Sequence, residues 1–469
     1  MSRPLPSCGP VNLGATMTAN FSPAELSRLA TPVPRYTSYP TAPHFSIDIS
    51  NLTYREWLHA MPQGSRLSLY VHIPFCDTLC WFCGCHTRMV RKYAPLRTYL
   101  EALEQEIATV AEHIPEGCSV THIHWGGGSP TMLLPEDIIR LNAAIHTAFP
   151  IARTCDFAVE IDPRGMDEAR LDALAEAGMT RASIGVQDFD PEVQRAINRF
   201  QSFEETRAVA EGLRQRGVNS LNVDLLYGLP HQNPAAMLKS LDQVLTLRPD
   251  RLALFGYAHV PWMKKHQEMI PTEALPGMPE RIECAERATG TLMEAGYTRI
   301  GLDHFALPTD SLAIAAATGT LRRNFQGYTT DDSDCLIGLG ASSIGQFPQG
   351  FVQNETGGQA YERRVKEIGL SVSRGLATTA EDRLRADAIE DLMCNLRLDL
   401  AQLRARHGAL VDMLVPEMTG LLAEEPADWF EKKEAGFAVT EAGRPFLRLI
   451  AARFDAYLAR GTGRHSSAM

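Results

Sequence analysis

The chain has 469 residues, of which 45% are hydrophobic, and its 45 basic and 56 acidic side chains give a formal net charge of −11 at pH 7. This length is sufficient for one large domain with one or two smaller ones. The negative charge disfavours nonspecific binding to nucleic acid or anionic membranes, and no stretch is apolar enough to cross a bilayer, so we expect neither as a partner.

The N-terminal residues and the scattered cysteines favour a cytoplasmic protein. Residues 1–20 lack the apolar core of a signal peptide. In a reducing compartment, cysteines that occur singly are most simply thiols, not disulfides. Six of the ten cysteines are of this kind: Cys8, Cys118, Cys155, Cys284, Cys335 and Cys394.

Residues 67–260 repeat one pattern, in which a short β-rich run is followed by a turn and an amphipathic helix. The strand-like runs are 67–75, 120–127, 157–163, 181–189, 218–230 and 251–260, and clear helical stretches are 96–114 and 166–179. Repeated units of this kind predict a parallel sheet with right-handed crossovers. Ligands are then expected where the strands end, at their carboxyl termini.

The last ninety or so residues follow a different pattern. Helical periodicity covers residues 381–408 and 444–460, which flank the run GFAVTEAGR at 436–444. This arrangement predicts a small winged-helix-like domain. The Gly-containing segment 374–382 is a plausible boundary.

Four cysteines are crowded into the short loop after the first predicted strand. Cys76, Cys80 and Cys83 have the spacing C-x3-C-x2-C, and Cys85 follows closely. Three thiolates from one loop suit a [4Fe–4S] cluster whose fourth iron is left open. Cys85 lies too near Cys83 to complete the cluster easily, so we expect a separate functional thiol. A structural zinc loop is the alternative, although its ligands normally come in pairs from separated places.

Several polar or glycine-containing motifs follow the other predicted strands. Residues 126–131 read GGGSPT, which is either a bare turn or a loop that exposes backbone N–H groups to a ligand. Glu160 ends the third predicted strand, and its carboxylate is either a ligand contact or a solvated charge. Arg199 is either part of a polar ring or a surface partner of Asp190. Gln187 and Asp224 occupy comparable positions.

The cysteine spacing, together with four sequence runs, one of them within the cysteine loop, carries a family resemblance. A C-x3-C-x2-C loop after a first strand resembles the radical S-adenosylmethionine (SAM) superfamily. The runs at 34–45, 80–86, 323–330 and 336–346 resemble the oxygen-independent coproporphyrinogen III oxidases within it. The resemblance extends from about residue 30 to the C-terminal domain.

This resemblance implies the fold and the division into domains. We expect an α/β protein with a partial (β/α)6 TIM-like barrel of the radical SAM type and a small, mainly helical C-terminal domain. Residues 1–50 would form an extension over the active site, residues 51–375 the barrel domain with its own extension, and residues 376–469 the winged-helix-like domain.

The resemblance also implies roles for individual residues. The cofactors would be a [4Fe–4S] cluster and SAM, with two SAM molecules expected. The cluster ligands would be Cys76, Cys80 and Cys83, and Cys85 would assist catalysis. The contacts to the cluster-bound SAM would be Tyr70, Gly127, Glu160 and Ile344. The residues lining a second SAM site would be Phe82, Gly128, Ser129, Gln187, Arg199, Asp224 and Ala258.

The activity implied is the oxidative decarboxylation of the ring A and ring B propionates of coproporphyrinogen III to vinyl groups, through a 5′-deoxyadenosyl radical, giving protoporphyrinogen IX. Its partners would be coproporphyrinogen III and a low-potential electron donor such as flavodoxin or ferredoxin, and the protein would be a monomer. The candidates to bind propionates are Arg35, Arg322 and Arg323. The candidates to donate protons are His72, His122, His124, His259 and His304, each of which has a structural alternative.

The nearest alternative is a haem chaperone of the same superfamily. Such chaperones typically lack the fourth cysteine and the run RYTSYPT, both of which are present here at Cys85 and at residues 35–41. A radical SAM methyltransferase is a second alternative. For the run Arg35–Tyr39, a surface strand competes with a segment lying over the site.

Overall fold

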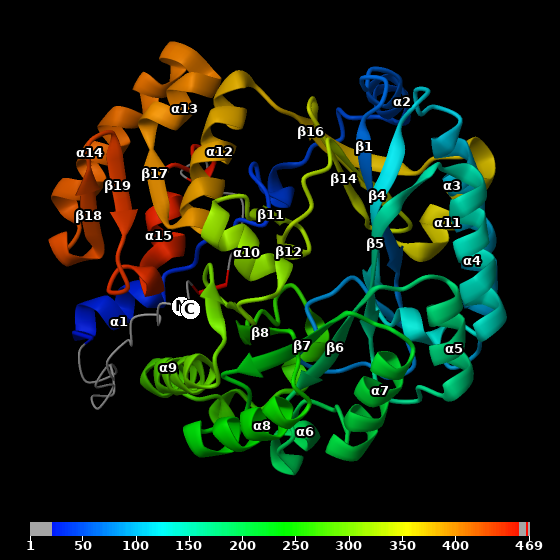
Figure 1. The fold of residues 1–469 in the computed structure, drawn as a ribbon, viewed down its shortest axis with the longest axis horizontal. Coiled ribbons are helices and arrows are strands. Elements are labelled where there is room, and N and C mark those ends of the chain that lie inside the picture. Colours follow the sequence, from blue (N-terminus) through cyan, green and yellow to red (C-terminus); the bar gives the residue numbers. More distant parts are fainter. Residues whose placement is uncertain (1–20, 459–465, 468–469) are drawn as a thin grey trace, which may run out of the picture.

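The computed structural model describes residues 21–458 and 466–467, and it is built around one twelve-stranded sheet (Figure 1). Six strands are parallel and adjacent in chain order. They are β1 (Arg66–Ile73), β4 (Ser119–Gly127), β5 (Ile151–Ile161), β6 (Arg181–Gln187), β7 (Ser220–Tyr227) and β8 (Arg251–Gly256). All six coincide with predicted runs, so the parallel α/β sheet is confirmed.

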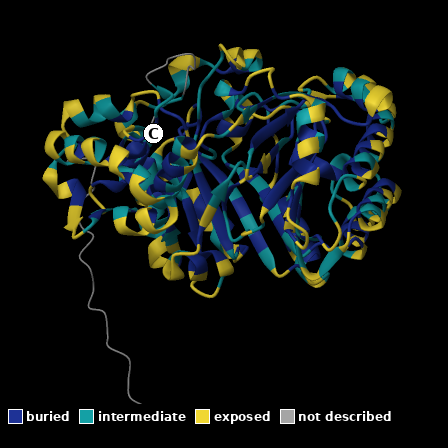
Figure 2. Ribbon diagram, turned by 90° about the horizontal axis from the view of Figure 1, so that it is seen from above, coloured by how far each residue is buried: buried dark blue, intermediate teal, exposed yellow. Residues whose placement is uncertain are grey.

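Helices between these strands cover the outer face of the sheet. They are α3 (Ala94–Ala111), α4 (Pro135–Ala148), α5 (Glu168–Glu176), α6 (Pro191–Ala196), α7 (Phe203–Gln215) and α8 (Pro234–Thr246). Local signals set several of their starts: Ser202 and Glu205 form a capping box on α7, and the side chain of Asn233 caps α8. The strands are mostly dark blue in Figure 2, whereas the outward faces of the helices are exposed.

The parallel sheet is extended at both edges. Beside β1 lie β13 (Cys335–Leu339), which is parallel to it, and then the antiparallel strands β14 (Ile344–Phe347), β15 (Gly350–Asn354) and β16 (Val372–Ala377). Beside β8 lie β10 (His304–Ala306) and β9 (Thr298–Ile300), both antiparallel. Three helices accompany these strands: α9 (Met278–Glu294), α10 (Ser311–Thr318) and α11 (Gly358–Ile368).

The C-terminal region has its own core and a three-stranded sheet of order β17–β19–β18. Its elements are α12 (Ala380–Asn395), β17 (Arg397–Asp399), α13 (Leu400–His407), α14 (Val415–Glu424), β18 (Phe430–Lys433), β19 (Gly436–Val439) and α15 (Leu447–Ala452). This alternation of helices with a small antiparallel sheet agrees with the mainly helical domain expected. The domain limits at residues 50 and 375 stay predictions.

Two predicted helices were too long. The expected helix at 381–408 is interrupted at Leu396, whose φ of 53° is left-handed and ends α12. The next residues form β17 and pair with β19. This pairing gives their backbone N–H and C=O groups the hydrogen bonds that a continued helix would have supplied. In the predicted helix at 444–460, the α-helix is confined to α15 within the described residues.

The N-terminal segment is divided between the two cores. Helix α1 (Pro23–Leu29) contributes Leu29 to the C-terminal core, whereas α2 (Asn51–His59) packs its Tyr54 and Leu58 into the core beneath the sheet. Tyr36 and Tyr39 are each only 4% exposed and lie in the C-terminal core, so the alternative of a surface strand for this run is wrong.

Two further expectations concern cysteines and membranes. Every cysteine in the described part of the chain is a free thiol, as expected, and Cys8 lies outside that part. Among the helices described at residues 21–458, none has the length and apolar character of a membrane span.

Candidate functional site

The cysteine loop begins directly after β1, at the carboxyl end of the parallel strands. Short strands β2 (Phe75–Cys76) and β3 (Arg88–Met89) pair at its base and define its two ends. The loop also rests on the segment after α6. Trp81 N–H donates to the carbonyl of Ile197 at 2.9 Å, and Asn198 Nδ2 donates to the carbonyl of Leu79 at 2.9 Å.

A distant segment, residues 264–267, holds the same loop from the other side. Three of its side chains donate hydrogen bonds to backbone carbonyls of the loop. Lys264 Nζ donates to Cys85 at 2.9 Å, His266 Nε2 to Cys83 at 2.7 Å and Gln267 Nε2 to Phe82 at 2.9 Å. Gln267 is 1% exposed, and its Oε1 accepts from the backbone N–H of Val260 at 2.6 Å. We call residues 264–267 the loop clamp. Sequence reasoning missed it.

The thiols of the loop have surroundings suited to thiolates. Cys80 is buried, and its Sγ accepts from Arg164 Nη2 and Arg199 Nη1, each at 3.6 Å. Cys76 Sγ lies 3.0 Å from the hydroxyl of Thr87, and Cys83 Sγ accepts from the backbone N–H of Cys85 at 3.4 Å. Donors directed at sulfur stabilise negative charge and tune the potential of iron–sulfur clusters. These residues therefore fit a [4Fe–4S] cluster.

The three thiols do not form a site for a single ion. Within the described residues, no group of three or more His, Cys, Asp or Glu side chains is arranged to hold one metal ion. In a cluster each cysteine binds a different iron, so its thiolates need not converge on one point. Ligation by Cys76, Cys80 and Cys83 stays a prediction from their spacing.

The glycine turn after β4 is needed for close packing. A Cβ on Gly127 would lie 2.4 Å from the ring of His72, and one on Gly126 would lie 2.6 Å from Glu160 Oε1. The N–H groups of Gly127, Gly128 and Ser129 donate to Glu160 Oε2, Ile73 O and Phe75 O at 3.0, 2.9 and 2.7 Å. The protein itself uses these three N–H groups, and the role of the three residues in binding a ligand stays a prediction.

Glu160 is the centre of a polar wall formed by the ends of β1, β4 and β5. Its two carboxylate oxygens contact His124 Nε2 at 3.3 Å and Gly127 N–H at 3.0 Å. Burial raises the pKa of Glu160, but these contacts outweigh it and hold the pKa below its ordinary value. The side chain is still 42% exposed, so an ionised carboxylate faces the site. Tyr70 stands beside it, with its hydroxyl 2.9 Å from His72 Nδ1.

Arg199 is buried and belongs to the site, not to the surface. It is 6% exposed, and its guanidinium contacts both oxygens of Asp162 at 3.3 Å and donates to the carbonyl of Gly185 at 2.7 Å. The alternative pairing with Asp190 is wrong, because Asp190 caps α6 instead. Burial raises the pKa of Asp162, but Arg199 and Arg164 lower it below its ordinary value. Asp162 and Arg164, in the run IDPRG after the third strand, were missed.

The other predicted site residues occupy neighbouring strand ends. Gln187 has a left-handed φ of 70°, and a Cβ on Gly185 would lie 3.1 Å from its Nε2. Asp224 accepts from Ser183 Oγ at 3.1 Å and Asn222 Nδ2 at 2.8 Å, and burial raises its pKa. Phe82 packs near Ile197, and the hydroxyl of Ser129 is hydrogen-bonded to that of Thr131. The carbonyl of Ala258 accepts from Gln267. The backbone of Ile344 lies against Gly338, which pairs with Tyr70 in the sheet.

The candidate histidines differ in location. His72 and His124 lie in the polar wall, and His259 and His304 contact Tyr257 and Asp303 near the end of β8. His122 lies near the start of β4, 3.1 Å from Asp331, so it is not brought to the site.

A buried carboxylate supports the site from behind. Glu106, on α3, accepts from Gly340 N–H, Tyr361 hydroxyl and Asn354 Nδ2 at 2.7, 2.7 and 2.6 Å. Tyr99, on the same helix, donates to His72 O at 2.7 Å and accepts from the N–H of Ala341 at 2.8 Å. Together these side chains fix the ends of β1 and β13 just before the cysteine loop.

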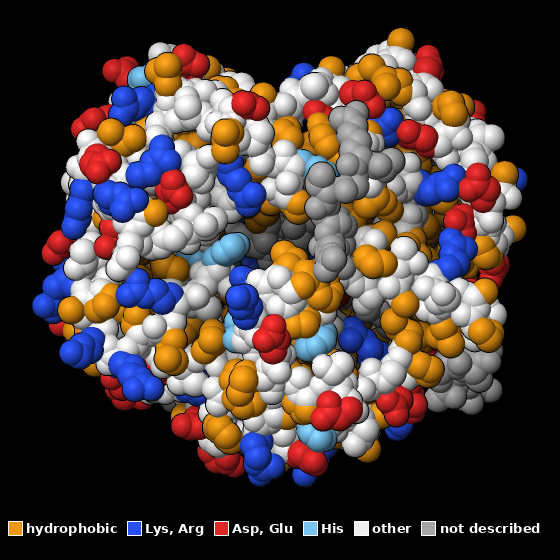
Figure 3. All heavy atoms as spheres, turned by 180° about the vertical axis from the view of Figure 1, so that it is seen from behind, with side chains coloured by type: hydrophobic (Ala, Val, Ile, Leu, Met, Phe, Trp, Pro, Cys, Tyr) orange, Lys and Arg blue, Asp and Glu red, His pale blue; other side chains and the backbone are white. Residues whose placement is uncertain are grey.

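An arginine-rich pocket of about 750 Å³ adjoins the end of β8, between α9 and the C-terminal domain. Six arginines and four carboxylates line it: Arg35, Arg281, Arg299, Arg323, Arg444 and Arg448, with Glu286, Glu294, Asp303 and Glu441. Two of the three arginines proposed from sequence are therefore brought together. The third, Arg322, is directed to Glu390 at 3.2 Å. The back of the molecule is hollowed near its middle, with histidine and basic side chains around the hollow (Figure 3).

Known proteins resemble this chain over nearly its full length. The family model described as the radical SAM superfamily matches residues 70–244. Oxygen-independent coproporphyrinogen III oxidases from Paracoccus denitrificans and Bradyrhizobium diazoefficiens are each 48% identical, with 93% of this chain and 96% and 97% of theirs covered. The solved structure of the Escherichia coli coproporphyrinogen III oxidase, described as a radical SAM enzyme, is 39% identical, with a TM-score of 0.87 over 90% of this chain and 97% of that one.

Proposed function

The chain belongs to the oxygen-independent coproporphyrinogen III oxidase family of radical SAM enzymes, and on that basis we propose that it converts coproporphyrinogen III to protoporphyrinogen IX. Two propionate side chains, on rings A and B, become vinyl groups, and each loses a hydrogen atom from its β-carbon, carbon dioxide and one electron, which passes to an electron acceptor. That hydrogen is not acidic, so acid–base catalysis alone cannot remove it. The observation that carries the proposal is a thiol-rich loop beside an ionised carboxylate and an arginine-rich pocket.

The cofactors would be held by the strand ends. A [4Fe–4S] cluster with SAM supplies the hydrogen-abstracting radical when both are bound. Cys76, Cys80 and Cys83 would hold the cluster, and the arginines at Cys80 would offset thiolate charge. The loop clamp keeps the loop backbone fixed, and the packed aromatic side chains near Phe82 limit access of water. Cys85, whose carbonyl is fixed by Lys264, would act as the separate catalytic thiol.

Residues for SAM fall into two sets. Tyr70, Gly127, Glu160 and Ile344 would contact the molecule on the cluster. A second molecule would lie against Phe82, Gly128, Ser129, Gln187, Arg199, Asp224 and Ala258. Most of these residues lie in or just after the parallel strands β1, β4, β5, β6, β7 and β8, whereas Arg199 follows α6 and Ile344 begins β14. Their common location at this end of the sheet supports a cofactor site, and the division into two sets rests on the family resemblance.

Replacing Glu160 with glutamine should weaken SAM binding while leaving the cluster in place. A charge-assisted hydrogen bond contributes about 1.5–3 kcal/mol, so the Kd should rise roughly 10- to 100-fold. The measurement is SAM titration of the cluster-loaded protein. Since the pKa of Glu160 is lowered, wild-type affinity should stay constant above the ordinary carboxyl pKa and fall only as the pH drops through the lowered value.

Glu168→Gln is the matched control, because Glu168 lies on α5 with its side chain 80% exposed and paired to Arg216. It should bind SAM like the wild type. Equal affinities for wild type and Glu160→Gln would remove Glu160 from the SAM site.

The arginine-rich pocket is suited to carboxylates that persist through the reaction. Arg281 has a buried Nε without a partner among the described residues, and its Nη2 donates to the carbonyl of Tyr257 at 2.9 Å. Burial lowers its pKa, and nearby Arg35 lowers it further. A bound carboxylate would relieve both costs. The pocket also includes Ala258, so it is continuous with the proposed cofactor site.

Replacing Arg281 with glutamine should therefore raise the KM for coproporphyrinogen III by roughly 10- to 100-fold, with a smaller change in kcat. The exposed Arg287→Gln on the same helix α9, where Arg287 pairs with Glu283 at 3.3 Å, controls for charge. A KM unchanged in Arg281→Gln would exclude a substrate contact at this position.

The function is tested by an anaerobic assay of reconstituted protein with SAM, a reductant and coproporphyrinogen III. Chromatography of the oxidised porphyrins should show protoporphyrin, with 5′-deoxyadenosine formed alongside. A loaded cluster without vinyl product would favour the haem chaperone, and a methylated product would favour a methyltransferase. Flavodoxin or ferredoxin would serve as the low-potential donor. We propose a cytoplasmic monomer, supported by the family resemblance.

A further inference from the structure

The outer side of the cysteine loop carries a concentration of positive charge. Two short segments, residues 84–92 and 262–267, contain five lysine or arginine side chains and no carboxylate. The five are Arg88, Arg91, Lys92, Lys264 and Lys265. Lys264 is half-buried and the other four are exposed, and none of the five forms an ion pair within the described residues. In a chain with a net charge of −11, this surface, which we call the basic rim, is a local reversal of sign.

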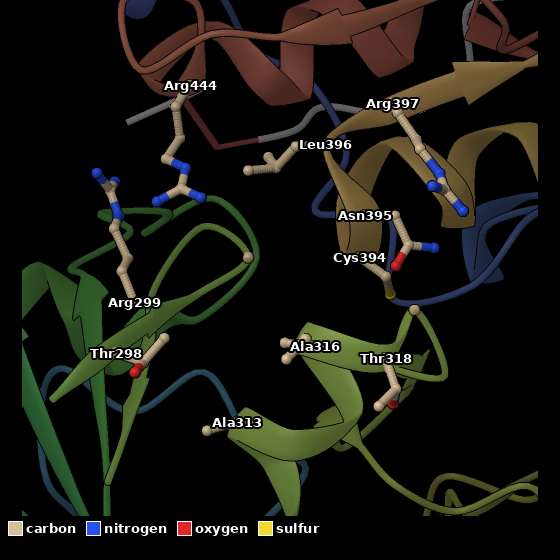
Figure 4. Close-up of a pocket in the computed structure, with 13 residues that line it drawn as sticks. Thr298, Arg299, Ala313, Ala316, Thr318, Cys394, Asn395, Leu396, Arg397 and Arg444 are labelled. Carbon is tan, nitrogen blue, oxygen red and sulfur yellow. The ribbon is translucent and has the colours of Figure 1, made fainter. Parts of the chain in front are cut away.

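Arginines elsewhere in the chain line internal cavities. A cavity of about 400 Å³ between β9, α10 and the turn after α12 has Arg299 and Arg444 at one end and Arg397 at the other (Figure 4). Arg444 is 8% exposed, so this positive charge is internal and is divided between two places. The cations of the basic rim are at the surface, where another macromolecule can contact several of them at once.

The two segments of the basic rim meet at the cysteine loop. Lys264 Nζ donates to the carbonyl of Cys85 at 2.9 Å. Arg88 follows Cys85 by three residues, so their Cα atoms lie at most about 11 Å apart. The tip of the loop, residues 84–86, is exposed. The basic rim therefore flanks the point at which the loop that would hold the cluster reaches the surface.

Large apolar side chains are exposed beside these cations. Trp262 and Met263 are 50% and 62% exposed, and Met89, which follows Arg88 in β3, is 46% exposed. Tryptophan and methionine are enriched where proteins contact one another, and large apolar side chains gain nothing from exposure to water. Their exposure within a charged surface therefore indicates a protein partner.

Carboxylates near the basic rim do not cancel its charge. Asp77, earlier in the loop, interacts with Arg164, and Glu362, on α11, interacts with Arg88. Glu268 directly follows the second segment. Five cations against these three carboxylates leave the surface positive.

We propose that the basic rim is the docking surface for an acidic, low-potential electron-carrier protein. A positive surface favours a negative partner and disfavours positive ones. Weak redox complexes bury less than about 1,200 Å², which suits a surface built from two short segments. The net charge of −11 opposes nucleic acid and anionic membranes. The proposal rests on the proposed function and adds where its reductant binds. One electron passes from the reduced carrier to the oxidised cluster, and no bond or proton is transferred with it.

The first test is the binding of flavodoxin, used as the acidic carrier, to the cluster-loaded full-length protein by calorimetric titration. The double variant Arg88→Glu with Lys265→Glu should raise the Kd at least tenfold at low ionic strength, because it replaces attraction by repulsion. Added salt should weaken wild-type binding and affect the variant much less. The variant leaves the loop clamp intact where it meets Cys85, because Lys264 makes that contact.

The matched control is Arg207→Glu with Lys239→Glu, which changes the net charge by the same amount. Arg207 lies on α7 with its side chain 53% exposed, and Lys239 is exposed on α8. This variant should bind flavodoxin as the wild type does. An unchanged Kd in the rim variant, or an equal rise of the Kd in the control, would overturn the proposal.

A second measurement follows electron transfer without SAM or porphyrinogen, so it does not depend on the oxidase assay. Photoreduced protein is mixed with oxidised flavodoxin, which would accept the electron in the same docked complex, or with oxidised methyl viologen, a small cation. Transfer to flavodoxin should be at least tenfold slower in the rim variant at low ionic strength, and transfer to methyl viologen should not be slower. Equal slowing with both acceptors would place the defect in the cluster and reject the docking surface.

Discussion

Replacing Cys80 with alanine is expected to abolish the iron–sulfur cluster and with it all detectable turnover. Cys80 is the most deeply buried thiol of the loop, and two arginines donate to its sulfur. Without the thiolate, the arginines Arg164 and Arg199 lose an anionic partner and one iron loses its protein ligand. The measurement is iron and acid-labile sulfide content after anaerobic reconstitution, followed by the oxidase assay. Cys76→Ala and Cys83→Ala should behave in the same way.

The Cys85→Ala variant is the control within the same loop. Its backbone is fixed by Lys264 through the carbonyl, which alanine retains, so the cluster should form normally. Turnover should nevertheless fall, by roughly 10²- to 10⁴-fold if Cys85 transfers a proton or hydrogen in the reaction. Loss of iron from Cys85→Ala would show that the separation of ligand and catalytic thiols is wrong.

Replacing Glu106 with alanine should lower the free energy of unfolding by about 3–5 kcal/mol, because three buried donors lose their shared acceptor. Those donors are the N–H of Gly340, the amide of Asn354 and the hydroxyl of Tyr361. Glu101→Ala, an exposed position on the same helix, should change it by less than about 0.5 kcal/mol. Denaturant unfolding of both variants measures the difference.

Glu106 should also make the free energy of unfolding depend on pH. Burial raises the pKa of Glu106 from 4.5 to about 7, against the hydrogen bonds that lower it. Its contribution to stability is therefore full below the unfolded pKa and is lost as the pH rises through 7, a decline of about 3 kcal/mol by linkage. Glu106→Gln cannot titrate, so this part of the slope should vanish. An identical slope in wild type and Glu106→Gln would assign the pH dependence to other groups.

The features predicted correctly from sequence are those with a local signal. The six parallel strands follow from β-rich runs that alternate with helices, and the location of Glu160 near the end of β5 follows from the predicted end of the third strand. The helix expected through Leu396 failed because the left-handed turn there depends on pairing with β19, which lies far along the chain.

Support residues without a local signal were missed for a physical reason. Gln267 acts on the carbonyl of Phe82, 185 positions away, and Glu106 acts on the amide of Gly340, 234 positions away. Each contact joins a side chain to a backbone group. Nearly every residue type carries the same backbone groups, so the sequence at Phe82 or Gly340 does not reveal the partner. The convergence of six arginines on one pocket is also a product of tertiary structure, because they come from separate segments.

The loop clamp sets an order of events during biosynthesis. His266 is made 183 residues after Cys83, whose carbonyl it binds. At the usual pace of translation, the cysteines leave the ribosome on the order of ten to forty seconds before the clamp exists. During that interval the loop lacks the three hydrogen bonds that the clamp supplies. We therefore expect stable iron loading of the cysteines to follow synthesis of the clamp.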